Sequence, residues 1–194
     1  MSFKTVPQMF QHLVSERPTL KTFYTKTENG WEGVELADLQ VMVEDFANGL
    51  KNLGINDNDK VAIIGANSRK WAISDYAIAH IRAVSVPVYP TLIPAQSQYV
   101  VEHSESKIAI VQDEVQLDKV YPLINDANSN LNTIIIMDDE YSGGKENVIN
   151  FGDVFNMKDQ VHDIRALSAT VQENDLLTLI YTSGTTGNPK GVML

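Results

Sequence analysis

Residues 60–88 read KVAIIGANSRKWAISDYAIAHIRAVSVPV, which is an apolar run, a helix-like segment and a second apolar run. The runs at 61–64 and 84–88 are rich in β-branched residues and do not alternate regularly between apolar and polar positions. Strands of a parallel sheet are covered on both faces and have this largely apolar pattern. The segment therefore predicts a β-α-β unit whose two strands lie in one sheet.

The same rhythm continues toward the C-terminus. Apolar runs begin at residues 61, 84, 108 and 133, which are 23, 24 and 25 residues apart. Helix-like segments separate these runs, at residues 69–82, 94–103 and 114–127. The units share no residue pattern, so the even spacing does not indicate an internal repeat. We predict an α/β fold, a doubly wound and mainly parallel sheet flanked by helices, in a single domain over residues 1–194.

Shorter elements are predicted on either side of this core. A first helix begins near residue 6 and ends at Arg17-Pro18, because the residue before proline avoids helical geometry. Asn29-Gly30 separates two strand-like runs, which predicts a small β-hairpin. Apolar residues spaced three and four apart over residues 36–53 predict an amphipathic helix that Gly54 caps.

The rhythm breaks after residue 137. Residues 138–150 are polar and contain glycine, and residues 156–172 are only vaguely periodic, which together predict a surface excursion. A last buried strand is predicted at residues 176–181, directly ahead of a segment rich in glycine and hydroxyl side chains.

The composition excludes several classes of function. The chain has no cysteine, which removes disulfides, thiolate metal ligands and cysteine nucleophiles. Fifteen Lys and Arg against 25 Asp and Glu give a net charge of −10, the wrong sign for non-specific binding of nucleic acid. No apolar run approaches the about 20 residues that span a bilayer, so we expect no transmembrane segment. Without a targeting signal at the N-terminus, the sequence predicts a cytoplasmic protein.

Residues 181–191, YTSGTTGNPKG, have the composition of a phosphate-binding loop. Closely spaced glycines let successive backbone N–H groups converge on one oxyanion, and hydroxyl side chains add donors. Lys190 is the only charged residue between residues 176 and 194, and a compact cation suits phosphate. The predicted phosphate-binding residues are Thr182, Ser183, Gly184, Thr185, Thr186, Gly187 and Lys190.

This loop differs from a Walker-type P-loop. The pattern GxxxxGK[ST] requires a second glycine where Pro189 stands, and it runs directly into a helix. Pro189 and Gly191 both oppose a helix, and residues 191–194 favour a strand. The alternative for such a patch is a surface turn rich in glycine and hydroxyl groups.

Residues 179–194, LIYTSGTTGNPKGVML, resemble the signature of the adenylate-forming (AMP-binding) enzymes, which include acyl-CoA synthetases and peptide-synthetase adenylation domains. Residues 83–91, AVSVPVYPT, are similar to a region of long-chain fatty-acyl-CoA ligases, and the combination favours that branch. The chain has Asn58 and Arg82 where the family usually has glycine. Asparagine tolerates left-handed backbone geometry, whereas Arg82 must point outward without a role that the sequence assigns.

The resemblance implies a two-step reaction. A carboxylate attacks the α-phosphate of ATP to give an acyl-adenylate and pyrophosphate, and the CoA thiol then takes the acyl group. In such enzymes the matching loop holds the β- and γ-phosphates while Mg²⁺ neutralises them. ATP, a fatty acid and CoA are therefore the implied small-molecule substrates, with peripheral membrane contact of the whole enzyme left open.

Members of the family are more than twice as long as this chain. The resemblance therefore implies the N-terminal fragment of a long-chain fatty acid–CoA ligase, whose adenine, metal, CoA and acyl sites lie elsewhere in the enzyme. We expect the fragment alone to be inactive, and we assign it no catalytic residue and no metal ligand. Two alternatives stay open: a nucleotide-binding or regulatory module without catalysis, and an adenylation domain that loads a carrier protein.

A few residues outside the loop invite a functional interpretation. His80 and His103 lie in helix-like segments, and a structural place is expected for both rather than a catalytic one. Pro87, Tyr89 and Pro90 mark the exit of a predicted strand at the ligand end of the sheet, where they either face a substrate or stiffen the chain.

Overall fold

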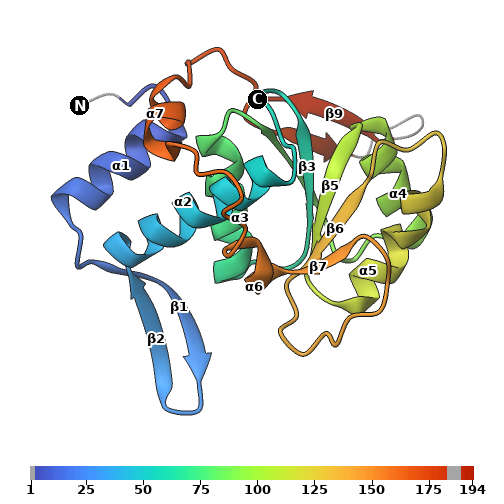
Figure 1. Ribbon diagram of the computed structural model, residues 1–194, viewed down its shortest axis with the longest axis horizontal. Helices are drawn as coiled ribbons and strands as arrows, with labels where there is room; N and C mark the ends of the chain where they lie inside the picture. Colours follow the sequence, from blue (N-terminus) through green and yellow to red (C-terminus); the bar gives the residue numbers. More distant parts are fainter. Residues whose placement is uncertain (1–2, 183–188) are drawn as a thin grey trace.

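The computed structural model describes residues 3–182 and 189–194 of the chain, and a parallel sheet runs through its centre (Figure 1). Five strands form this sheet in the order β4-β3-β5-β6-β7, and every neighbouring pair is parallel. The strands are β3 (Lys60–Ile64), β4 (Val84–Val88), β5 (Ser106–Val111), β6 (Thr133–Ile136) and β7 (Val148–Asn150). The predicted doubly wound, mainly parallel sheet is confirmed.

Alternate residues of the central strands serve two hydrophobic cores, one on each face of the sheet. Val61 and Ile63 of β3 belong to the core on one face, and Ala62 and Ile64 belong to the core on the other. The first face is covered by α1 (Val6–Glu16), α2 (Leu36–Asn52), α3 (Arg69–His80), α6 (Phe151–Val154) and α7 (Ile164–Ala169). The second is covered by α4 (Pro94–His103), α5 (Glu114–Val120) and a 3₁₀ helix at Tyr121–Asn125. Within the described ranges, no helix has the length and apolar character needed to cross a membrane.

The predicted hairpin projects from the body of the molecule (Figure 1). It consists of β1 (Lys21–Thr27) and β2 (Gly30–Glu35), which are antiparallel. Gly30 has a positive φ of 118°, a conformation that glycine adopts without steric cost. The Arg69 guanidinium, at the start of α3, donates to the carbonyls of Phe23 (3.3 Å) and Glu32 (3.0 Å) and so ties both strands to the helix.

The prediction of a surface excursion at residues 138–150 and 156–172 is wrong for part of both stretches. β7 adds an edge strand beside β6 in the first stretch. Between the two stretches, Phe151 of α6 is buried against Phe46 of α2, with ring centroids 4.4 Å apart. Ile164 of α7 is also buried. These elements contain three to six residues, which is too few for a hydrophobic period to be recognised in the sequence.

A separate two-stranded sheet lies at the C-terminal end of the chain. β8 (Leu179–Thr182) pairs with β9 (Lys190–Met193) in antiparallel register. The strand expected near residues 191–194 is therefore confirmed. The buried strand expected at residues 176–181 is wrong in its burial, because β8 alternates between half-buried and exposed positions.

Arg82 joins the start of β4 to the segment that leads into β8. Its backbone is left-handed (φ 58°), as is that of Asn58 (φ 63°), whose N–H donates to the Arg82 carbonyl at 2.8 Å. The guanidinium binds Asp175 through two parallel hydrogen bonds of 2.9 and 3.0 Å and reaches Asp57 at 3.0 Å. A fork of this kind fixes direction as well as distance. The outward-pointing Arg82 thus has a structural partner 93 positions away.

The Arg82–Asp175 pair makes stability depend on pH in the acid range. Hydrogen bonds from Arg82, and then from the Gln172 N–H, hold the pKa of Asp175 below its usual value. The pair therefore stabilises the folded protein above the unfolded-state pKa of about 3.9 and loses this contribution as the pH falls through the lower folded-state pKa. We expect Arg82→Gln to flatten the decline of the unfolding free energy below about pH 4, measured by urea denaturation at a series of pH values.

Lys4→Ala is the matched control for Arg82→Gln. Lys4 forms an exposed ion pair with Glu173 at 3.2 Å, close in sequence to Asp175, and exposed pairs contribute little. The Lys4→Ala variant should follow the wild-type pH profile. An Arg82→Gln profile parallel to that of the wild type would contradict the role given to the fork.

The core over the first face of the sheet predicts a large effect at Phe46. This side chain is fully buried between Phe151 and Phe155, so Phe46→Ala leaves a cavity and should lower the unfolding free energy by about 3–5 kcal/mol. Val41 lies on the same helix with 55% of its surface exposed, and Val41→Ala should change the value by about 0.5 kcal/mol or less. Chemical denaturation of the two variants gives the comparison, and equal losses would refute it.

Candidate functional site

The antiparallel pair of strands β8 and β9, which we call the β8–β9 ribbon, carries the two described ends of the predicted phosphate loop. Thr182, the last residue of β8, is paired with Lys190, the first residue of β9. Residues directly opposite each other on antiparallel strands extend their side chains from the same face. Thr182 and Lys190 are both exposed, so the ribbon presents a hydroxyl and an ammonium group together.

The chain ahead of β8 attaches this ribbon to the edge of the main sheet. The Ser85 N–H donates to the Leu177 carbonyl (3.1 Å), and the Thr178 hydroxyl donates to the Ser85 carbonyl (2.9 Å). Ser85 and Thr178 form a parallel bridge, so β8 continues in the direction of β4. The end of β8 therefore lies at the carboxyl edge of the parallel sheet, where open α/β sheets bind their ligands.

A cavity of about 180 Å³ opens at this edge, between the ends of β3, β4 and β8. Pro87 lines it from β4, Tyr89 and Pro90 line it from the segment that directly follows β4, and Tyr181 lines it from β8. The structure thus places these three residues of the β4 exit beside the candidate site. Tyr89 is 69% exposed and is available for contact with a ligand.

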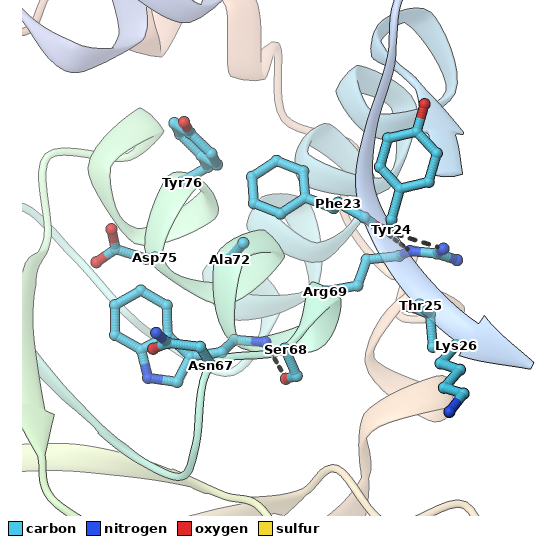
Figure 2. Close-up of a pocket in the computed structure, with 11 residues that line it drawn as sticks. Phe23, Tyr24, Thr25, Lys26, Asn67, Ser68, Arg69, Ala72, Asp75 and Tyr76 are labelled. Atoms are coloured by element: carbon cyan, nitrogen blue, oxygen red, sulfur yellow. Dashed lines mark hydrogen bonds between the residues drawn. The ribbon is translucent and has the colours of Figure 1, made fainter. Parts of the chain in front are cut away.

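A larger cavity of about 640 Å³ lies between α3 and the β1 strand of the hairpin (Figure 2). The two cavities adjoin, because Asn67 and Trp71 line both. Figure 2 shows Asp75 on the α3 side of the larger cavity, with Lys26 on the β1 side. The sequence pattern does not reveal this cavity, because its walls come from segments more than 40 residues apart.

Burial changes the acidity of two side chains in the larger cavity. The pKa of the Asp75 carboxyl is raised, chiefly because burial disfavours its charged form. Burial also raises the pKa of the neighbouring Tyr76 phenol, and the Asp75 charge adds to that shift. Both groups therefore keep their protons to a higher pH than the same side chains would in water.

The structure places two of the seven predicted phosphate-binding residues. Thr182 and Lys190 are brought opposite each other, as described above. The other five lie outside the described residues, and their predicted role stays a prediction: Ser183, Gly184, Thr185, Thr186 and Gly187.

Two side chains of α4 contact the base of this loop, and the sequence interpretation missed both contacts. The Tyr99 hydroxyl donates to the Pro189 carbonyl at 3.1 Å. Nδ1 of His103 is hydrogen-bonded to the Tyr181 hydroxyl at 2.8 Å. The available signal was the spacing of Tyr99 and His103, which at four positions apart share one face of a helix. His80, by contrast, is buried beside Phe10 in the core, where burial lowers its pKa.

The implied Mg²⁺ finds no ready-made site in the described residues. No three carboxylate or histidine side chains gather there in a way that could hold a metal ion. Thr182 and Lys190 supply a hydroxyl and a cation, and an ammonium group repels a metal. With an ammonium group opposite the hydroxyl and no carboxylate cluster in the described residues, the pair suits phosphate oxygens better than a metal ion, and no step below is assigned to Mg²⁺.

Comparison with known proteins adds a family to this geometry. The model of the family described as AMP-binding enzyme matches residues 10–194. Rat (Rattus norvegicus) long-chain-fatty-acid–CoA ligase ACSBG1 is 29% identical over 192 residues, covering 98% of this chain and 26% of that protein. Mycobacterium bovis long-chain-fatty-acid–CoA ligase FadD15 is 28% identical over 186 residues, covering 96% of this chain and 30% of that protein. The chain thus spans less than a third of the length of these relatives.

A solved structure with the same architecture supports the fold independently. The inhibitor-bound N-terminal domain of FACL13 from Mycobacterium tuberculosis matches with a TM-score of 0.78 at 22% sequence identity. The match covers 99% of this chain and 44% of that domain. At this level of identity the likeness establishes the arrangement of helices and strands.

Proposed function

The chain belongs to the AMP-binding enzyme family, and we propose that it forms the N-terminal, phosphate-binding part of a long-chain fatty acid–CoA ligase. In this proposal residues 1–194 are a portion of a larger AMP-binding domain. The observation that carries it is the pairing of Thr182 with Lys190 at the ends of a glycine-rich loop, at the carboxyl edge of a parallel sheet. A donor and a cation held side by side there suit the polyphosphate of ATP.

The proposed reaction has two steps. A carboxylate oxygen of the fatty acid attacks the α-phosphorus of ATP, and the bond from that phosphorus to the oxygen of the β-phosphate breaks. The products are an acyl-adenylate and pyrophosphate. The CoA thiol then loses its proton as its sulfur attacks the acyl carbonyl, the bond from the acyl carbon to the phosphate oxygen breaks, and AMP leaves with that oxygen as a thioester forms.

The role of this chain falls on the first step. Lys190 places its positive charge, and Thr182 its hydroxyl, against the β- and γ-phosphates, where negative charge grows as pyrophosphate departs. Donors fixed in advance lower the barrier because they need little reorganisation during the reaction.

The choice of a fatty acid and of CoA rests on the relatives. ACSBG1 and FadD15 are both named as long-chain-fatty-acid–CoA ligases, and each alignment covers almost all of this chain. The β4 exit, with the VPVYPT pattern of residues 86–91, lies at the cavity beside Tyr181, where a substrate can be reached. We also propose a cytoplasmic location, where both ATP and CoA are supplied.

Lys190→Ala tests the function in the whole enzyme that contains this chain. We expect the fatty-acid-dependent exchange of pyrophosphate into ATP to slow by about 30- to 1,000-fold, the equivalent of about 2–4 kcal/mol of transition-state stabilisation. The control is Lys158→Ala, which removes an exposed lysine whose nearest carboxylate, that of Asp45, is 3.8 Å away. An exchange rate that Lys190→Ala leaves at the wild-type level would refute the role of the loop.

The isolated 194-residue chain separates the proposal from its alternatives. We expect neither exchange activity nor micromolar ATP binding by calorimetry, because a phosphate grip alone supplies only part of the binding that adenylation requires. Micromolar ATP binding by the chain would instead favour a nucleotide-binding module. In the whole enzyme, transfer of the acyl group to a carrier protein and not to CoA would favour a carrier-loading adenylation domain.

A further inference from the structure

We propose that Tyr99 and His103 of α4 are positioning residues that hold the two ends of the phosphate loop in register, and so set the geometry of Thr182 and Lys190. The proposal rests on the proposed function of that loop. It extends that function to α4, which acts on the phosphate-binding residues through the β8–β9 ribbon. It assigns to α4 a role in ATP use.

The contacts from α4 reach one residue before each member of the Thr182–Lys190 pair. His103 is bonded through Nδ1 to the Tyr181 hydroxyl, on the strand that enters the loop. Tyr99 donates its hydroxyl to the Pro189 carbonyl, on the segment that leaves it. One helix thus grips both sides of the loop base.

The aromatic rings of Tyr99, His103 and Tyr181 also pack against one another, which links the two hydrogen bonds. The rings of Tyr99 and His103 have centroids 5.2 Å apart, and His103 meets the Tyr181 ring edge-on at 5.7 Å. Tyr181 pairs across the ribbon with Gly191, and a Cβ atom built on that glycine would lie only 3.2 Å from the Tyr181 ring. Tyr181 is therefore held between β9 on one side and α4 on the other.

The ribbon needs this support at the end that carries the loop. A two-stranded pairing of four residues a side is marginal on its own. The bridge from Thr178 to Ser85 anchors the opposite end, four residues before Thr182. Between that bridge and the loop, the contacts of Tyr181 and Pro189 with α4 fix how the strand ends lie.

The helix that provides the grip is itself well anchored. Val100 and Val101 are buried against the second face of the sheet. Gln98 donates to the Lys119 carbonyl at 2.7 Å, and the Lys119 ammonium donates to the Pro90 carbonyl at 2.6 Å. These bonds join α4 to α5 and α5 to the segment that follows β4. The contacts of α4 with the loop base are therefore fixed relative to the sheet edge that carries the candidate site.

Kinetics of the whole enzyme test the proposal. We expect Tyr99→Phe and His103→Ala each to lower kcat/KM for ATP in pyrophosphate exchange by about five- to tenfold, through a higher KM for ATP and a lower kcat. The KM for the fatty acid should stay unchanged. His103→Asn, which returns a polar nitrogen near the position of Nδ1, should recover part of the loss. His103→Ala and Tyr181→Phe should be non-additive, because both remove the same hydrogen bond.

Glu102→Ala is the matched control, since Glu102 is an exposed neighbour on the same helix and should retain wild-type kinetics. Wild-type kinetics in Tyr99→Phe and His103→Ala, beside a large loss in Lys190→Ala, would overturn the positioning role and leave the proposed function standing. A silent Lys190→Ala would instead overturn the function of the loop.

Hydrogen exchange provides a readout that does not depend on activity. We expect Tyr99→Phe and His103→Ala to increase amide exchange at residues 180–182 and 190–193, while the β3 and β5 amides keep their protection. Glu102→Ala should leave every region unchanged. Unaltered exchange across the ribbon in Tyr99→Phe and His103→Ala would show that α4 does not hold its ends, whatever reaction the enzyme performs.

Discussion

Ser85 donates to the Leu177 carbonyl and accepts from the Thr178 hydroxyl, and the position of the candidate site depends on these two contacts. They make the segment entering β8 parallel to β4, so the two strands end at the same edge. An antiparallel approach would carry the loop to the opposite edge, away from the cavity at the β4 exit. The Arg82–Asp175 fork lies just ahead of both partners and stabilises the same junction.

The net charge of −10 makes local donors decisive for an anionic ligand. The overall field of the protein repels a polyphosphate, and that repulsion is screened only in part over about 8–10 Å. Lys190 lies in a segment, residues 176–194, that contains no acidic side chain. The acidic residues lie earlier in the sequence, most densely between residues 112 and 175, so the segment that contains the loop has a net charge of its own of +1.

Local sequence patterns predicted most of the fold but not the contacts between residues that are far apart in the sequence. Apolar runs with even spacing identified the four strands β3 to β6, and Asn29-Gly30 identified the hairpin. β7 and α6 escaped because a few residues carry no measurable period. For the site, composition pointed to the loop at residues 181–191. The partner of Arg82 and the contacts of Tyr99 could not be predicted, since each joins residues about 90 positions apart and depends on how the sheet is assembled.

The motif at residues 181–191 combines residues that hold the loop base in place with residues that are exposed for contact with a ligand. The Tyr181 ring lies close above Gly191, and a Cβ atom there would come within 3.2 Å of the ring and push it by a few tenths of an ångström. The Tyr181 hydroxyl and the Pro189 carbonyl are each hydrogen-bonded to a side chain of α4. Thr182 and Lys190, each one position further along, extend into solvent. Residues bonded to α4 and residues exposed to solvent therefore alternate at the two described ends of the loop.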